Sequence, residues 1–123
     1  MMKKVLLIED NPLLTGLYKA ALEKAGLEVH VAHDGKRGIE LAQEKKPDLI
    51  ILDFLMAGMN GLEVLKVLKS DPEMQKIKAI MLTVSGSAQT KEDAKKLGVA
   101  DYIIKSEVTV DEIVKTVLGH IEA

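Results

Sequence analysis

Five side chains of types that carry out chemistry each follow a short apolar run of the chain: Glu9, Asp10, Asp53, Thr83 and Lys105. Three of them are carboxylates, which repel one another when close and raise the pKa of at least one member unless a cation neutralises them. Ligands that are all oxygen select a hard cation, and Mg²⁺ (or Mn²⁺) uses few carboxylates, keeps several waters and bridges to phosphate. The set therefore predicts a divalent ion beside a phosphoryl group.

The remaining chemistry can be assigned within the same set. Asp53 is a candidate nucleophile, because carboxylates form acyl phosphates. Lys105 offers a mobile positive charge and Thr83 one hydroxyl donor to phosphoryl oxygens. Phosphorylation of Asp53 would replace a carboxylate by a dianion, which the metal ion and Lys105 would stabilise.

The element that positions Asp53 is the run at residues 48–53, which is continuously apolar before the acid, as in a strand buried on both faces. Four other apolar runs, near residues 5–8, 28–32, 78–83 and 100–104, alternate with helical patterns. Such alternation predicts an α/β domain with a parallel sheet, helices on both faces and right-handed crossovers. Strand order 2-1-3-4-5 would bring the acids of the first and third strands together.

The helices have recognisable ends. Asn11-Pro12 predicts the start of the first helix and Gly26 its end. A second helix is expected over residues 36–45, and capping-box patterns predict the third and fifth helices, at Asn60 with Glu63 and at Thr109 with Glu112. The fourth, near residues 88–97, has few apolar anchors, so it is expected to shift at low cost.

Composition excludes several classes of protein. The 123 residues fit one domain, 47% of them are hydrophobic, and 17 basic against 19 acidic residues leave no basic surface for nucleic acid. Cysteine is absent, which excludes disulfides and thiolate sites. No run resembles a signal peptide or a membrane span, so we expect a cytoplasmic protein that binds neither membrane nor DNA.

The motifs around these residues resemble those of a response-regulator receiver domain of two-component signalling, and the similarity covers residues 1–123. The matching fragments are the acidic pair in residues 7–11, the acceptor in residues 51–56, the threonine at 83, and residues 101–105. The resemblance implies a flavodoxin-like, doubly wound (βα)5 three-layer sandwich. It also implies a signalling switch rather than an enzyme.

The resemblance implies further that a histidine kinase or histidine phosphotransfer protein phosphorylates Asp53. Mg²⁺ would be held by both acids of the pair, by Asp53 and by the backbone carbonyl of Leu55. Thr83 would move onto the phosphoryl group and Tyr102 would turn inward. The surface formed by the fourth helix, fifth strand and fifth helix would then bind a downstream protein, with the chain a monomer or a weak, phosphorylation-promoted dimer.

Two positions depart from the usual family pattern, in which Ala57 and Ser106 would each be proline. A cis bond before a residue other than proline costs about 3 kcal/mol, so we expect a trans Lys105–Ser106 bond. Leu55 and Ser85 are expected to flank the phosphoryl group. Because Leu55 cannot orient an attacking water, slow dephosphorylation is predicted.

Other functions fit these residues less well, among them a flavin- or nucleotide-binding module, whose phosphate Glu9 and Asp10 would repel unless a metal intervened. An aspartate-nucleophile phosphatase would need a second aspartate where Leu55 stands, which disfavours that enzyme. A phosphorylation-independent docking module on the same fold is the main alternative, although it would not need the acidic pair, Thr83 or Lys105. Since the sequence ends just after the fifth helical pattern, we expect a stand-alone regulator, a relay intermediate or an isolated receiver.

Overall fold

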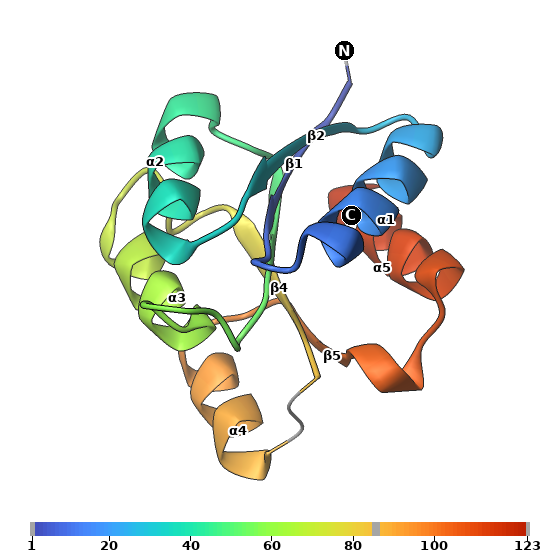
Figure 1. The fold of residues 1–123 in the computed structure, drawn as a ribbon. Coiled ribbons are helices and arrows are strands. Elements are labelled where there is room, and N and C mark those ends of the chain that lie inside the picture. The colour runs from blue at the N-terminus through green and yellow to red at the C-terminus, as the bar shows by residue number, and fades with distance from the viewer. Residues whose placement is uncertain (1, 85–86, 123) are drawn as a thin grey trace.

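The computed structural model describes residues 2–84 and 87–122 as a five-stranded parallel sheet between two layers of helices (Figure 1). The strand order is β2-β1-β3-β4-β5, as the sequence predicts. Strands and helices alternate along the chain: β1 (Lys4–Ile8), α1 (Pro12–Lys24), β2 (Glu28–Ala32), α2 (Gly35–Lys45), β3 (Leu49–Leu52), α3 (Gly61–Ser70), β4 (Lys78–Thr83), α4 (Ala88–Lys96), β5 (Asp101–Ile104) and α5 (Val110–Glu122).

The helices divide between the two faces of the sheet. Figure 1 shows α1 and α5 together on one face and α2, α3 and α4 on the other. Two apolar clusters fill the spaces between sheet and helices, and alternate residues of β1 and β3 point into each cluster. All four residues of β3 are buried, which confirms the prediction of a central strand covered on both faces.

Local side-chain bonds fix the helix ends near the carboxyl edge of the sheet. The Asn11 side chain accepts hydrogen bonds from the backbone amides of Leu13 and Leu14 at the start of α1. Asn60 and Glu63 form the predicted capping box of α3. These caps fix where α1 and α3 begin, and so where the loops after β1 and β3, which carry the acidic residues, end.

The predicted and observed boundaries differ slightly at the fifth strand. A short 3₁₀ helix, η1 (Lys105–Glu107), separates β5 from α5, and sequence patterning did not predict it. Among the described residues no peptide bond is cis, so the Lys105–Ser106 bond is trans as expected. No helix in the described part of the chain is both long and apolar enough to span a membrane.

Candidate functional site

Strand pairing brings the acids of β1 and β3 together at the carboxyl edge of the sheet. Ile8 of β1 pairs with Leu52 of β3, so the residues that follow each leave the sheet side by side. The backbone amide of Asp53 donates to the carbonyl oxygen of Ile8 at 3.1 Å, which continues the ladder one residue past the strand. The expected convergence of the acids is therefore a direct result of this strand order.

Glu9, Asp10 and Asp53 form a compact carboxylate cluster. Each offers an oxygen, and these atoms all lie within 4.8 Å of one another. Glu9 and Asp53 are only 2% and 6% exposed, whereas Asp10 is exposed. A site with two buried acids and one acid open to solvent can admit a small hydrated ion from one side.

Lys105 neutralises part of this charge. Its Nζ lies 2.9 Å from Glu9 Oε1 and 3.3 Å from Asp53 Oδ2, and its side chain is 9% exposed. Burial alone would lower the pKa of Lys105, but the two carboxylates outweigh burial and hold that pKa above its usual value. Lys105 is therefore a fixed cation between two acids at neutral pH.

Glu9 is not fully compensated. Its Oε2 is the buried side-chain polar atom without a hydrogen-bond partner among the described residues. Burial, with a smaller contribution from the neighbouring Asp53, raises the pKa of Glu9 to about 8 against the pull of Lys105. An orphaned carboxylate oxygen in a cluster of oxygen donors fits a hard divalent cation, which would satisfy that oxygen and reverse the pKa shift.

Backbone amides of the loop after β3 donate hydrogen bonds to two of the acids. The amide of Leu55 donates to Asp53 Oδ1 at 3.3 Å, and the amide of Ala57 donates to Asp10 Oδ2 at 3.4 Å. The Leu55 side chain, expected beside the phosphoryl group, is 50% exposed at the rim of the site. Leu55 therefore contacts the Asp53 carboxylate through its backbone amide, while its side chain faces solvent.

Gly61 is a site-supporting residue that sequence reasoning did not single out for that role. A Cβ on Gly61 would lie 2.5 Å from the carbonyl oxygen of Asp53 and 2.9 Å from the Cα of Phe54. The first residue of α3 therefore packs directly against the backbone that carries Asp53. In the sequence, the only sign of this role is a glycine just after the loop, and a glycine there is equally consistent with a tight turn or with close backbone packing.

Thr83 ends β4 at the same edge of the sheet and is completely buried. β4 lies between β3 and β5, where Leu52 pairs with Met81 and Thr83 with Ile104. Thr83 therefore stands between the strands that lead to Asp53 and to Lys105. Ser85, predicted to flank the phosphoryl group, lies outside the described residues.

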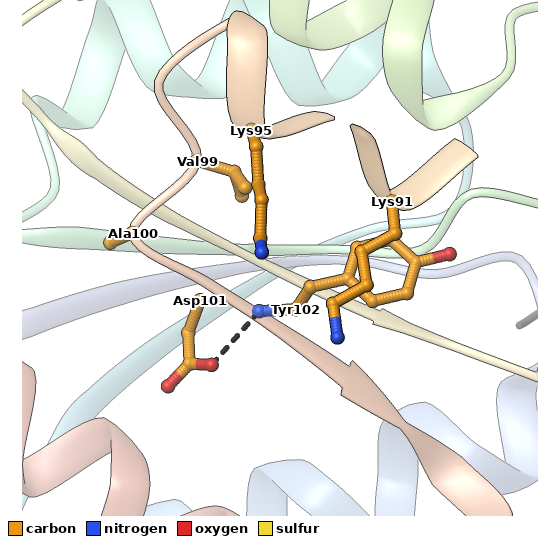
Figure 2. A pocket seen from close by; sticks show the side chains of 6 residues that line it. All are labelled: Lys91, Lys95, Val99, Ala100, Asp101 and Tyr102. Atoms are coloured by element: carbon orange, nitrogen blue, oxygen red, sulfur yellow. Dashed lines mark hydrogen bonds between the residues drawn. The ribbon is translucent and has the colours of Figure 1, made fainter. Parts of the chain in front are cut away.

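Tyr102 belongs to a second surface, between α4 and β5. It is partly buried and packs against the cluster under α2, α3 and α4. Figure 2 shows Lys91 and Lys95 extending from α4 toward β5, where Asp101 Oδ1 accepts a hydrogen bond from the Tyr102 amide at 2.9 Å. A hollow between the helix and the strand is lined by these residues, with Val99 and Ala100.

Comparison with known proteins gives one consistent result. Residues 5–118 match the sequence pattern of the response regulator receiver domain family. Protein PilH of Pseudomonas aeruginosa is 35% identical over 118 residues, which are 94% of this chain and 95% of PilH. The polar-differentiation response regulator DivK of Brucella anthropi is 32% identical, with 98% of each chain covered.

Solved structures agree with the sequence relatives. The chemotaxis protein CheY4 of Vibrio cholerae superposes with a TM-score of 0.90 at 28% identity, over 97% of this chain and 98% of that one. Sheet order, helix layers and domain length are thus shared with a protein of related sequence.

Proposed function

The chain belongs to the response-regulator receiver family, a family of two-component signalling modules, and from that premise we propose that it accepts a phosphoryl group on Asp53. The donor is a histidine kinase or a histidine phosphotransfer protein, and the transfer depends on Mg²⁺ or Mn²⁺. The observation that carries this proposal is the bridge from Lys105 to both Glu9 and Asp53 beside an unpartnered Glu9 oxygen.

Each residue of the site then has one part in the transfer. An Asp53 oxygen forms the bond to phosphorus while the bond from phosphorus to the donor's histidine nitrogen breaks. The Lys105 ammonium turns toward a phosphoryl oxygen and the Thr83 hydroxyl donates to another. Glu9, Asp10, Asp53 and the backbone carbonyl of Leu55 would hold the metal ion, which supplies positive charge to the phosphoryl oxygens when bound.

The output is a change of the surface formed by α4, β5 and α5. Movement of Thr83 toward the phosphoryl group opens space near β4, and Tyr102 turns inward to fill it. Only Thr90 and Ala94 are buried in α4, so little apolar area opposes a shift of that helix. A downstream protein binds the changed surface.

We further propose a cellular and oligomeric setting for this switch. The receiver domain spans residues 1–123, works in the cytoplasm as a monomer or a weak phosphorylation-promoted dimer, and contacts neither nucleic acid nor membrane. The near balance of 17 basic and 19 acidic residues supports the absence of nucleic-acid binding.

A docking module that works without phosphorylation is the alternative. Incubation with Mg²⁺ and acetyl phosphate, followed by intact mass, separates the two functions. The switch predicts a phosphoryl adduct on the wild type that is absent from Asp53→Ala, and faster hydrogen exchange in residues 88–96 of the adduct. A wild type that gains no adduct would contradict the proposal, as would an adduct that persists in Asp53→Ala.

A further inference from the structure

Tyr18 lies next to the acidic site without a part in the transfer described above. It belongs to α1, is 6% exposed, and lines a narrow cavity together with Glu9, Asp53 and Lys105. The cavity leaves no space for a water-sized sphere. Polar atoms that face this cavity therefore have to find their partners among its own lining residues.

The donors in this cavity are fewer than the acceptors. When a bound Mg²⁺ keeps Glu9 ionised, only Lys105 and Tyr18 among the described residues that line the cavity carry side-chain donors; the rest are the two acids and aliphatic residues. Lys105 Nζ already donates hydrogen bonds to Glu9 Oε1 and Asp53 Oδ2, whereas Glu9 Oε2 has no hydrogen-bond partner among the described residues. A buried carboxylate oxygen without a donor is costly, and more so where the local dielectric constant is low.

Phosphorylation of Asp53 would leave Glu9 with still fewer hydrogen-bond donors. When Lys105 turns to a phosphoryl oxygen, Glu9 Oε1 loses the donor that it has now. A metal ion on one oxygen of Glu9 would still leave the other unsatisfied. Tyr18 is the remaining donor, and burial raises the pKa of its phenol, with Glu9 and Asp53 adding to the rise and Lys105 opposing it, so the hydroxyl keeps its proton at neutral pH.

We propose that Tyr18 is a positioning residue whose hydroxyl donates to Glu9 once Lys105 has turned to the phosphoryl group. It acts through Glu9 and Lys105 and does not touch the phosphoryl group itself. This inference rests on the proposed function, because it assigns the partner that the acid receives when the lysine leaves.

The test uses Tyr18→Phe, which removes the hydroxyl and keeps the ring. Beryllofluoride (BeF3⁻) with Mg²⁺ serves as the probe, since it mimics a phosphoryl group on a carboxylate. We expect Tyr18→Phe to bind BeF3⁻ about tenfold more weakly than the wild type, as for a lost hydrogen bond to a charged group. The urea midpoint without Mg²⁺ and BeF3⁻ stays at the wild-type value, because the hydroxyl has no bond to Glu9 in that state.

The chain offers its own spectroscopic reporter. It has two tyrosines and no tryptophan, so Tyr18 is the single fluorophore in a Tyr102→Phe variant. A new hydrogen bond to a carboxylate quenches tyrosine emission, so BeF3⁻ with Mg²⁺ is expected to quench Tyr18 in this variant. The matched variant Tyr18→Phe, in which Tyr102 reports, gives a spectral change that belongs to the output surface alone.

The outcomes separate the two proposals. If the wild type binds no BeF3⁻, the phosphoacceptor function itself is wrong. If the wild type binds and Tyr18→Phe binds equally well, with no quenching of Tyr18, the function stands and the role of Tyr18 is overturned. A lower urea midpoint of metal-free Tyr18→Phe would also overturn it, because the hydroxyl would then be used before Lys105 moves.

Discussion

Glu9 makes the stability of the metal-free protein depend on pH. Its pKa is raised from 4.5 to about 8, chiefly by burial, so folding favours the protonated carboxyl. The stabilising contribution is therefore complete below about pH 4.5 and is lost as the pH rises through about 8. We expect the urea midpoint of the wild type without metal to fall between about pH 5 and about pH 9.

Glu9→Gln is the control, since its amide does not ionise and the fall should flatten. Mg²⁺ should raise the wild-type midpoint more at the alkaline end, where no proton competes for the carboxylate. Equal slopes for the wild type and Glu9→Gln would contradict this account of the site's charge.

Leu55 should determine how long the phosphoryl group survives. Its half-exposed side chain stands at the rim of the site and has no polar atom to orient a water. We expect Leu55→Asn to dephosphorylate faster, by about tenfold, as loss of the adduct by intact mass would measure. Leu55→Met is the matched control, and an unchanged rate for Leu55→Asn would refute the idea.

At the scale of single residues, sequence reasoning identified every acid in the cluster and Lys105, because each follows a strand in a sheet of predictable order. It could not identify Tyr18 or Gly61. Tyr18 is at a helical position that patterning assigns to the core, and the closeness of Gly61 to Asp53 depends on how the loop returns to α3. Both depend on how loops and helices pack at the site, which periodicity and capping patterns do not encode.

At the scale of elements, the position of the loop between β3 and α3 depends on close backbone packing at Gly61. Gly61→Ala would bring a Cβ within 2.5 Å of the Asp53 carbonyl oxygen, so backbone has to move. We expect a loss of about 1–3 kcal/mol in the free energy of unfolding, and weaker Mg²⁺ binding, because the loop carries the acids' amide partners.

Gly16→Ala is the matched control within the same protein. Gly16 lies inside α1, and a Cβ there meets nothing within 4 Å. This substitution should stabilise the protein by about 0.5–1 kcal/mol through helix propensity. If both variants shift the urea midpoint equally, close packing at Gly61 is not what holds the loop.

Elements as a whole were predicted better than their junctions. Caps and apolar periodicity located all five helices to within a residue or two, since these signals are local. The 3₁₀ helix after β5 has no side-chain cap bond, and residues 105–107 carry no periodic pattern. Its first residue, Lys105, forms ion pairs with Glu9 and Asp53, which are tertiary contacts that local patterning does not encode.

At the scale of the whole molecule, four of the exposed large apolar side chains lie on the segments that follow strands β1, β3 and β4. Leu13, Leu17, Leu55 and Val84 are 84%, 51%, 50% and 59% exposed, and all follow the carboxyl ends of strands β1, β3 and β4. A protein donor whose histidine reaches Asp53 approaches the carboxyl edge of the sheet, from which these segments leave. The four exposed side chains are therefore expected to contribute to donor binding.

Leu17→Ser tests that expectation. Transfer from a protein donor should slow by about tenfold at limiting concentration, which corresponds to about 1.4 kcal/mol of lost binding, while transfer from acetyl phosphate stays unchanged. Val67→Ser, an exposed apolar residue on α3, is the control. Equal slowing with both donors would place the effect in the site and not in docking.

The most direct test of Asp53 as the phosphoacceptor is to locate the phosphoryl group in the chain. After incubation with Mg²⁺ and acetyl phosphate, borohydride reduction converts an aspartyl phosphate into homoserine, which peptide mass spectrometry assigns to a position. If Asp53 is the phosphoacceptor, homoserine appears at residue 53 alone, and none appears when Mg²⁺ is chelated before the donor is added. A modification at Glu9 or Asp10, or a wild-type chain that remains unmodified, would contradict it.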